Sequence, residues 1–513
     1  MKKHIYIILS LFVSINIFSQ NSDDAIRYSS NQILGTARST ALGNAMGALG
    51  GDYTSIGINP AGIAVYRSSE FVITPSLNIT NTDSEYYNIK SSENRYSLPI
   101  QQIGYVGTYK PMYSGMNGIM STHFSIGYSR NNNFKKRSFI TANNVMSSLL
   151  GEFIYFAGNT NPDYLDSKTH HAYYSYLIDP LDENAIDNSN IKTEYMHAFK
   201  GVDNNNNIVW GPENGIYQRR ILDEKGYSGD FEIAGGFNVN NTFYFGATIG
   251  VPTFNYRQTM QHHEAVEPTD NPWPYLENYT FEESLRATGV GINAKFGMIY
   301  KPINAIRIGA SFHTPTFYEI NEGYSYSTIL PKGFQEYEIY DSDNYDFSYY
   351  MLTPYKFTGS LAYIIGNKGL ISVDYELVDY QKAKYSSTEV SHSEVSYFNS
   401  INNDIKNSLS QTHNFRVGAE YRPTELFTLR AGYSIYQSPY NEDFLNYDDK
   451  NQTFSGGFGI KINNMFIDLA YMLRQQQNYY SLYYNPDIHS QDQLPASIKT
   501  NRHSISATLG WRF

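Results

Sequence analysis

Apolar and polar residues alternate along most of the chain after Phe71. From Thr242 to Val251 every second residue is apolar, and the residues between them are mainly small or hydroxylated. A period of two is typical of β-strands, because successive side chains point to opposite faces of a sheet. The same alternation returns at 371–377, 415–422 and 504–513. The pattern therefore predicts a chain built mainly from β-strands.

Charged residues in these segments share the face opposite the apolar one. They are Lys295, Arg307, Asp374, Arg416, Glu420, Arg430 and Asp468. A charge on the lipid face of a membrane barrel costs roughly 2–4 kcal/mol at the bilayer midplane, which favours this separation. The segments also reach about ten residues, the length that a tilted strand needs to cross a bilayer. Both features indicate a transmembrane barrel rather than a soluble sheet.

The number and spacing of the segments define the barrel further. Fourteen can be counted, beginning near Phe71, Gln101, Ser121, Asp230, Thr242, Arg286, Ala305, Pro354, Gly369, Gln411, Glu425, Gln452, Met465 and Asn501. Tight turns such as Asn240-Asn241 alternate with long connections at 135–229, 257–285, 320–353, 383–410, 439–450 and 477–500. Short periplasmic turns and long external loops are typical of outer-membrane barrels. We therefore expect an all-β fold, a 14-stranded antiparallel transmembrane β-barrel over residues 70–513, whose longest external loop is 135–229.

Residues 20–69 have a different pattern from the rest of the chain. They are rich in small residues, and the apolar positions fall near helical spacing. These positions are Leu34, Ala37, Ala41, Leu42, Ala45 and Leu49. Small side chains allow a helix to pack closely against a wall. We expect an N-terminal helical hatch, or plug, in the barrel lumen, although a generic short helical cap would have the same composition.

The first 19 residues resemble a secretory signal peptide. Lys2 and Lys3 precede an apolar run from Ile5 to Phe18, and Ser19-Gln20 offers a cleavage edge. Such a segment directs export and is removed from the mature protein. No later run of 18 apolar residues would form a transmembrane helix. The expected location is therefore the outer membrane of a Gram-negative cell, with membrane lipid as a partner.

Composition narrows the class of protein. The chain has 48 Tyr and a mean hydropathy of -0.45, which fits a barrel because lumen-facing and lipid-facing residues average out. Tyrosine suits the headgroup level of a bilayer. The net charge of -11 argues against nucleic acid as a partner, and the absence of cysteine excludes disulfides and thiolate metal sites.

One N-terminal motif carries a family resemblance. The segment Asn59-Pro60-Ala61-Gly62-Ile63-Ala64 follows Gly50-Gly51-Asp52-Tyr53-Thr54-Ser55, and both resemble the hatch of the FadL/TodX family of outer-membrane transport proteins. Later segments, 307–311, 373–377 and 429–433, resemble strands of that family. The resemblance runs from about Ile33 to Phe513. It is fairly specific, because the motif stands just before fourteen alternating segments.

The resemblance implies a function for the barrel and its hatch. Members take up long-chain fatty acids or other hydrophobic compounds passively, by capture at external loops and rearrangement of the hatch, and a gap in the wall offers a sideways exit. Asn59, Pro60, Ala61 and Gly62 would form the hatch motif, with Asn59 holding the plug through backbone hydrogen bonds. An ordinary Asn-Pro turn is the simpler and compatible interpretation. No cofactor is implied.

The longest external loop contains a candidate for substrate contact. Val145, Met146, Leu149, Leu150, Phe153 and Ile154 form an apolar stripe at helical spacing. Asn143 or Asn144 could cap the start of this helix. The stripe could be one wall of a hydrophobic capture groove, or it could pack over the barrel mouth and stabilise the loop.

Two further sets of barrel residues are candidates. Pro75 lies inside the first strand, where proline cannot donate to the ladder, so it predicts a bulge or a local opening of the wall. Arg307, Arg416 and Arg430 face the lumen and could attract a carboxylate. They could equally pair with the acidic residues of the same face, which is the interpretation that we favour.

Other chemistry is less well supported by the sequence. His262, His263, Glu264 and Glu267, like His170-His171, are expected in solvated loops, with haem ligation as an alternative function and no structural metal. No nucleophile elbow, Walker loop or zinc-protease motif is present, so an enzyme is not expected. A structural or adhesive barrel is the remaining alternative. The chain ends on Phe513, which resembles the signal read by the barrel assembly machinery, and a monomer is expected.

Overall fold

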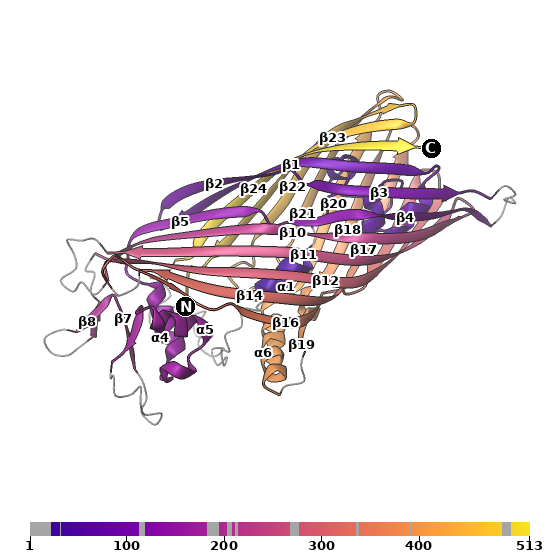
Figure 1. Ribbon diagram of the computed structural model, residues 1–513. Coiled ribbons are helices and arrows are strands. Elements are labelled where there is room, and N and C mark those ends of the chain that lie inside the picture. The colour runs from indigo at the N-terminus through magenta and orange to yellow at the C-terminus, as the bar shows by residue number, and fades with distance from the viewer. Residues whose placement is uncertain are drawn as a thin grey trace, which may run out of the picture.

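Fourteen wall strands form a closed antiparallel barrel in the computed structural model (Figure 1). The structure describes residues 22–30, 32–111, 118–181, 194–202, 208–210, 214–266, 276–334, 338–388, 392–484 and 494–513. Each wall strand pairs with the next along the chain, and the last pairs with the first, Glu70 lying opposite Arg512. The predicted barrel and its strand number are confirmed. The predicted leader, 1–19, lies outside the described residues.

Several wall strands consist of two consecutive pieces. In order around the barrel the strands are β1 (Glu70–Tyr86), β2 (Ile89–Ser97) with β3 (Ile100–Tyr109), β4 (Ile119–Asn133) with β5 (Lys136–Val145), β10 (Ile216–Val239), β11 (Phe243–Ala265), β12 (Asn278–Ile303), β13 (Ile306–His313) with β14 (Phe317–Ile329), β16 (Tyr345–Leu352) with β17 (Lys356–Ile365), β18 (Gly369–Asp379), β20 (Gln411–Tyr421), β21 (Phe427–Tyr436), β22 (Lys450–Ile462), β23 (Met465–Tyr480) and β24 (Ala496–Arg512).

Apolar side chains cover the outside of this barrel and charged ones lie inside. Arg416 is fully buried in the lumen, while Phe415 and Val417 on either side of it are 47% and 40% exposed. Water would leave these outward apolar residues exposed, whereas lipid solvates them, and closure of the barrel pairs every wall strand. The surface is therefore that of an outer-membrane barrel. No helix among the described residues is long and apolar enough to span a membrane.

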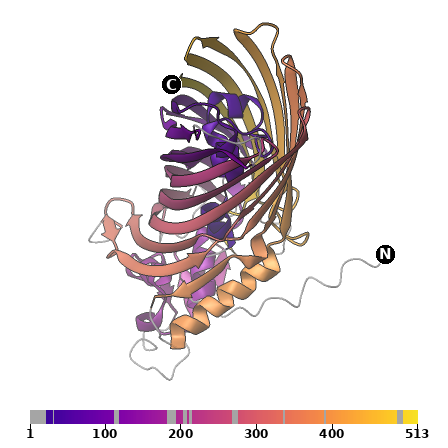
Figure 2. The ribbon, with the colours of Figure 1, turned by 90° about the vertical axis from the view of Figure 1, so that its right-hand side faces the viewer.

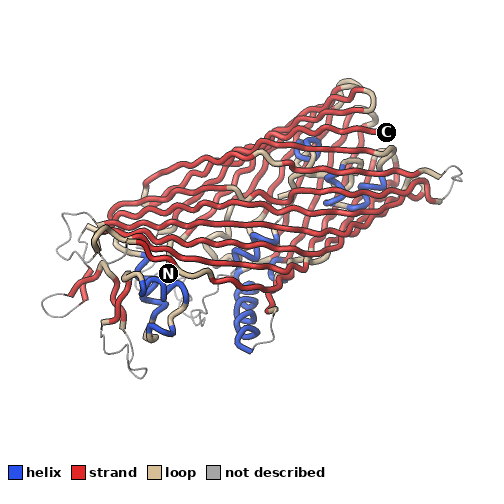
Figure 3. Tube along the Cα trace, viewed as in Figure 1, coloured by secondary structure: helices blue, strands red, loops and turns tan. Residues whose placement is uncertain are grey.

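Four short helices lie inside the barrel (Figure 3). They are α1 (Ser22–Ser29), α2 (Ala37–Ala41), α3 (Tyr53–Ile58) and the 3-10 helix η1 (Pro60–Val65). The hatch, defined as residues 32–69, occupies the end of the barrel where the chain terminates, and α1 lies nearer the middle (Figure 1). Tight turns close the hatch end, as at Asn463-Asn464 between β22 and β23. That end is therefore the periplasmic one.

The opposite end carries the longer connections and further short elements. These are α4 (Leu149–Ala157), η2 (Pro162–Tyr164), α5 (Ser167–Tyr174), β6 (Ile178–Pro180), β7 (Tyr195–His197), β8 (Lys200–Val202), β9 (Ile208–Trp210), β15 (Ile339–Asp341), η4 (Tyr380–Lys382), β19 (Lys384–Ser387) and α6 (His392–Ser408). Figure 2 shows α6 at this outer end of the barrel.

The external connections are shorter than the sequence suggested, because the strands project outward. β5 and the first half of β10 occupy both ends of the stretch predicted as the 135–229 loop. β11 and β12 likewise extend through most of 257–285. Beyond the bilayer no lipid enforces apolar alternation, so mixed polar strands look like loop in the sequence.

Candidate functional site

Much of the contact between hatch and wall is made by hatch backbone, beside packed side chains such as Tyr53 and Ile63. Wall glycines face it at positions where a Cβ atom would come within 2.1–2.4 Å of hatch backbone atoms. At Gly246 that atom is the carbonyl oxygen of Pro60, at Gly309 that of Gly47, and at Gly432 the amide nitrogen of Gly43. Small residues on both surfaces therefore permit an approach that any larger side chain would prevent.

Asn59 joins the hatch to itself and to the wall. Its Oδ1 accepts from the amide of Ala61 at 3.1 Å and so caps η1, the helix that Pro60, Ala61 and Gly62 begin. Its Nδ2 donates to the carbonyl of Gly47 at 2.6 Å and to that of Met298 in β12 at 3.2 Å. The residue is 1% exposed. One amide side chain thus bridges two hatch segments and a wall strand.

Ion pairs hold the same half of the lumen together. Glu420 of the wall accepts from Arg430 at 2.8 Å and from Arg38 of the hatch at 3.3 Å, and Arg430 also pairs with Asp468. These ion pairs compensate for the hydration that the charges lose on burial, because a buried charge is stable only when it has a partner.

The other two luminal arginines predicted from the sequence have similar contacts. Arg416 pairs with Glu376 at 3.1 Å and lies 3.7 Å from Asp374, whose carboxylate also accepts from the amide of Gly47. Arg307 donates to the carbonyl of Leu49 at 2.5 Å. All three arginines are therefore occupied with wall or hatch partners.

The predicted apolar helix begins later than expected. β5 continues through Asn143 and Asn144 to Val145, and Ser148 caps α4 by accepting from the amide of Leu150. The prediction of an asparagine cap is wrong, since Asn144 takes a left-handed conformation at the end of a strand. Met146 lies outside the helix and is exposed.

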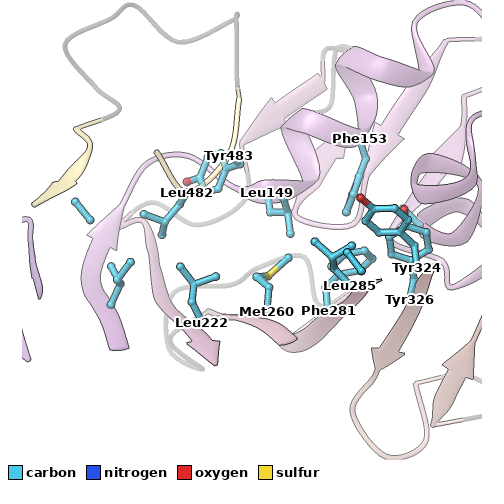
Figure 4. Close-up of a cluster of buried hydrophobic side chains, with 14 of the residues drawn as sticks. Leu149, Phe153, Leu222, Met260, Phe281, Leu285, Tyr324, Tyr326, Leu482 and Tyr483 are labelled. Carbon is cyan, nitrogen blue, oxygen red and sulfur yellow. The ribbon is translucent and has the colours of Figure 1, made fainter. Parts of the chain in front are cut away.

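Most residues of the predicted stripe lie inside an external core. We call it the outer apolar cluster, and it joins α4 to β10, β11, β12 and β14 (Figure 4). Leu149, Leu150 and Phe153 are 0–1% exposed, and the rings of Phe153 and Phe281 are 5.2 Å apart. Val145 is buried and Ile154 half-buried at its border. In this conformation most of the stripe is therefore packed inside the cluster, and its contact with substrate stays a prediction.

The histidines expected in solvated loops lie in regular structure instead. His262 and Glu264 are fully buried in β11. The Nε2 of His262 lies 2.8 Å from Glu264, and its Nδ1 accepts from Arg220 Nε at 3.1 Å. Neither ring nitrogen is therefore free to ligate haem iron in this conformation. Glu267 lies outside the described residues.

Glu264 connects the mouth of the barrel to α4. Its carboxylate accepts from the amide of Leu149 at 3.0 Å, from Gln218 at 2.8 Å and from the hydroxyl of Tyr279 at 2.8 Å, and Ser148 also donates to it. A carboxylate at the first turn of a helix is favourably placed. Glu264 therefore holds α4, and with it the outer apolar cluster, on the wall of the barrel.

The second histidine pair is helical rather than in a loop. His171 lies in α5, is buried, and its Nε2 is 3.1 Å from Thr328 Oγ1. Burial lowers the pKa of His171 to about 4. Among the described residues no three or more His, Cys, Asp or Glu side chains gather as a metal site would require.

A polar chamber of about 370 Å³ lies between the hatch and the outer end of the barrel. Residues of α1 form one side, and wall residues of β5, β10, β20, β23 and β24 form much of the rest. Two of its arginines, Arg474 and Arg502, were not among the site residues expected from the sequence. Both lie on the inward positions of alternating strands, so extending the period of two would have placed them in the lumen.

Helix α1 links this chamber to the outer end. The ring of Tyr28 stacks on that of Phe254 at 4.3 Å, and the Arg27 guanidinium lies 4.4 Å from the centre of the Tyr256 ring. Tyr440 of an external connection donates to Asp23. The chain leaving α1 leads directly into the hatch, so one short helix touches both regions.

The wall contains a seam where the backbone ladder stops and side chains make the joins: Ser91 donates to the carbonyl of Phe139, and Asn133 Nδ2 donates to Ser97 Oγ at 3.0 Å. β3 pairs with β4 only from Gln102 opposite Ser129 to Tyr109 opposite Thr122. Further out, their continuations β2 and β5 are joined by no backbone ladder among the described residues. The amide of Gln32 donates to Asn131 at 2.8 Å and Leu34 forms a bridge with Arg130, just past the last paired residue of β4. A hatch segment therefore adds to β4 where its neighbouring strand departs.

Pro75 lies beside this seam and interrupts two ladders. The register of β1 with β3 shifts between Thr74 and Pro75, and pairing with β24 omits both residues. Hydrogen bonding resumes at Ser76, whose amide donates to Pro99 at 2.9 Å. The proline thus forms a bulge, and an opening at this point stays a prediction.

These features define a plugged outer-membrane barrel of fourteen strands. Solved structures share this fold. A Pseudomonas aeruginosa FadL homologue has a TM-score of 0.53 and 11% identity, covering 94% of this chain and 100% of its own. The Pseudomonas putida toluene transporter TodX has a TM-score of 0.50 and 12% identity, covering 94% and 99%. A TodX variant described as a monoaromatic hydrocarbon channel reaches 0.54 at 12% identity.

The chain therefore has the FadL/TodX fold, as its hatch motif predicted. At such low identity the likeness concerns the fold alone. Of these neighbours, TodX is described as a toluene transporter and as a monoaromatic hydrocarbon channel. No protein-family model matches the sequence, and no curated protein sequence matches it.

Proposed function

We propose that this protein carries hydrophobic small molecules, and long-chain fatty acids in particular, passively across the outer membrane. The observation that carries the proposal is a closed barrel filled by a hatch whose outer segment completes the unpaired seam of the wall. An open pore would pass water-soluble molecules, whereas this arrangement separates the two sides until the hatch moves. The channels that share the fold carry hydrophobic compounds, which supports the same class of substrate here.

Capture begins at the outer apolar cluster in this proposal. Each buried CH₂ group gains about 0.8 kcal/mol on leaving water, so an apolar site can take up an acyl chain without an energy source. The cluster is closed in this conformation, so a ligand must displace part of it. Separation of α4 from Phe281 would expose Leu149 and Phe153 as the walls of a groove.

Movement then passes from the outer end to the seam. Helix α1 stacks on the wall through Tyr28 and continues into Gln32 and Leu34, which bond to β4. A ligand that shifts α1 would draw this segment away and uncover the edge of β4 at Arg130 and Asn131, where β3 and β4 part and only side chains join the wall. Apolar substrate could then leave sideways into the membrane rather than through the periplasmic end.

The test is uptake of labelled oleate by cells that lack their own carrier. Because the chain contains no cysteine, Leu34→Cys with Arg130→Cys gives a single disulfide that holds the segment on β4. We expect the oxidised variant to lose uptake and the reduced variant to regain it. The matched control, Ser284→Cys with Ser325→Cys, joins two paired wall strands far from the hatch and should transport in both states.

Two outcomes would contradict this proposal, the first its transport function and the second only its exit route. The first is no oleate uptake by the wild type at surface levels equal to those of the folded variants. The second is equal uptake by the oxidised and reduced seam variants, which would reject the exit route while leaving capture intact. Asn59→Ala, and the triple change of Leu149, Leu150 and Phe153 to Ser, extend the test to hatch and cluster.

A further inference from the structure

A groove rich in lysine lies between α6 and the segment formed by η4 and β19, and we call it the α6 groove. It has a volume of about 370 Å³, which falls within the range of small-molecule sites, roughly 300–1,000 Å³. The described residues that line it are Gln381, Lys382, Ala383, Lys384, Asn399, Asn402, Asn403 and Lys406. Three of them are basic and none is acidic, although the whole chain has a net charge of -11. The groove is therefore a local concentration of positive charge.

Helix α6 is held beside β19 by one asparagine. Asn402 Oδ1 accepts from the amide of Tyr385 at 2.7 Å, and its Nδ2 donates to the carbonyl of the same residue at 2.9 Å. This side chain satisfies both backbone groups of Tyr385, as a neighbouring strand would. The face of α6 with Phe398, Ile401 and Ile405 packs into the outer apolar cluster. The polar positions 399, 403 and 406 are left to line the groove.

The three lysines of the groove are exposed and form no ion pair with a described residue. Lysines elsewhere at the outer end do have acidic partners, as Lys90 has Glu85 and Lys225 has Asp223. The positive charge of the α6 groove is therefore available to an anion from outside the chain.

The acids near the groove are directed elsewhere. Asp379 accepts from the amide of Gln381 at 3.2 Å and from Gln411 at 3.3 Å, and Ser387 donates to Glu394. Asp404 belongs to α6 but is not among the lining residues. None of these carboxylates occupies the space between the lysines.

The length of β18 places the groove at the level of the outer lipid headgroups. β18 has 11 residues, from the periplasmic turn at Gly369 to Asp379, and η4 follows at once. At about 3.4 Å per residue and a tilt of roughly 40°, such a strand rises about 29 Å, slightly more than the apolar band of about 25 Å. Lys382 therefore stands just beyond the apolar band, where lipid phosphates lie.

Lys384 also points to the membrane side of the wall. It lies opposite Leu352 of β16, and directly opposed residues of an antiparallel pair share a face. Leu352 is 38% exposed, whereas its neighbour Met351 is buried with Tyr385 in the outer apolar cluster. The outward face at this position is the one that meets lipid. A lysine here keeps its stem along apolar surface and its ammonium at the headgroup level.

We propose that the α6 groove binds the phosphate headgroup of a lipid in the outer leaflet of the membrane. Ammonium groups bind phosphate as point charges, and basic pockets at a membrane surface bind anionic headgroups. The amides of Asn399 and Asn403 add neutral donors to the same site. The inference goes beyond the proposed function, because this lipid is a resident of the membrane and not the transported molecule.

The bound lipid would hold α6 on the rim of the barrel. Lys382 and Lys384 belong to the wall side of the groove and Lys406 to the helix, so one phosphate between them bridges the two. Because α6 also carries Phe398 and Ile405 into the outer apolar cluster, the lipid would stabilise that cluster from the membrane side.

A matched pair of lipids tests the site. The full chain is placed in uncharged lipid discs that contain either a bisphosphorylated lipid A or the same lipid after removal of its phosphates, with a chelator present to remove divalent cations. Bound lipid is counted by native mass spectrometry. A basic residue at an anionic surface contributes about 1 kcal/mol, or roughly fivefold in affinity. We therefore expect Lys382→Gln, Lys384→Gln and Lys406→Gln to weaken binding about fivefold each, and the triple variant about a hundredfold.

Controls separate the groove from general charge and from folding. Lys225→Gln removes an exposed lysine of the outer end that already has an acidic partner and should leave binding unchanged. Lys384→Arg keeps the charge and should keep most of the affinity. Equal binding of the phosphorylated lipid by the wild type and the triple variant would overturn the proposal, as would equal binding of the two lipids by the wild type.

Two further measurements identify the ligand and its place. Inorganic phosphate that binds as tightly as the phosphorylated lipid would show a site for a free anion and overturn the assignment to a membrane lipid, whereas weak competition supports it. The phosphorylated lipid should slow hydrogen exchange in 397–408 of the wild type and not of the triple variant. Equal slowing in both would place the lipid elsewhere and overturn the proposal. Oleate uptake tests the transport function separately, since none of the three lysines lies on the proposed route.

Discussion

The two halves of the lumen are built on opposite principles. In the periplasmic half, wall glycines contact hatch backbone, and every charge described above has a partner of opposite sign or a carbonyl. In the outer half, α1 rests on aromatic rings of β11, and a chamber lies between α1 and the wall strands β20, β23 and β24, where Arg474 and Arg502 are directly opposite each other. Ion pairs and close backbone contacts therefore join hatch and wall in the first half, while the second half contains a chamber that a ligand could enter.

The comparison suggests where motion starts. A region in which polar groups are satisfied resists change, because each broken hydrogen bond exposes a buried group. A region with incomplete charge pairing can gain stability when a ligand enters. We therefore expect ligands to act first at α1 and the chamber, and the hatch to move second.

The largest effect should follow from removing the close contact between wall and hatch. Gly246→Val places a side chain where the carbonyl of Pro60 lies, so the hatch cannot dock. We expect a permanently open barrel that admits large hydrophilic antibiotics, measured as increased sensitivity and as conductance in planar bilayers. Gly359→Val is the control, since a Cβ there meets no atom within 4 Å. Equal antibiotic sensitivity of the two variants would show that the close contact between wall and hatch does not keep the barrel closed.

The next largest effect concerns the outer apolar cluster. Phe153→Ala leaves a cavity in a closed core, a change that costs about 3–5 kcal/mol. We expect α4 to become protease-sensitive while the barrel remains folded by its heat-modifiable gel mobility. Met146→Ala is the control, because Met146 is exposed. If α4 of the variant resisted protease as well as α4 of the wild type, the outer apolar cluster would not be what holds this helix in place.

A smaller change should follow from the amide of Asn59. Asn59→Ala removes the oxygen that caps η1 and the donors to Gly47 and Met298, whereas Asn59→Asp keeps the capping oxygen but places a buried carboxylate against these two carbonyl oxygens. Each lost hydrogen bond costs about 1 kcal/mol, and a buried charge without a partner costs more. We therefore expect the hatch to be looser in the aspartate variant than in the alanine variant, seen as faster hydrogen exchange in 53–65. The reverse order would show that capping of η1 outweighs the buried charge.

The smallest effect is one of pH at the outer half. Burial, and then the neighbouring Asp23, raise the pKa of Asp449 from 3.8 to about 7. A raised carboxyl pKa favours the docked state when protonated, so docking of α1 weakens as pH rises from about 4 through 7. Fluorescence from a label on α1 should follow this window, and Asp449→Asn should flatten it. An unaltered pH profile of the fluorescence in that variant would show that a group other than Asp449 titrates in this window.

The barrel could be predicted from the sequence because lipid imposes the pattern. Phe415, Arg416 and Val417 must face outward, inward and outward, and this constraint repeats in all fourteen segments. Where lipid ends, the constraint ends too, so the outer parts of β10 and β11 were assigned to loops and His262 to solvent. α4 is capped by Ser148 rather than Asn143, because β5 continues past Asn143.

The chamber could not be predicted from the alternation of apolar and polar residues alone. A period of two places Arg474 and Arg502 inside, but only the register of β23 against β24 makes them neighbours. The contact of Gln32 with Asn131 joins segments about a hundred residues apart, and no local pattern marks it. The Asn59 motif was visible because its resemblance is local, whereas its partner Met298 was not.

The unequal lengths of the wall strands give the outer rim a direction. β10, β11 and β12 have 24, 23 and 26 residues, whereas β18, β20 and β21 have 11, 11 and 10. At about 3.4 Å per residue the longest strand measures about 88 Å, against an apolar band about 25 Å tall. The wall is therefore tall on the side of β10, β11 and β12 and low on the side of β18, β20 and β21, where α6 lies. In the proposed function, a molecule dissolved in the outer leaflet would therefore meet the low side of the rim first.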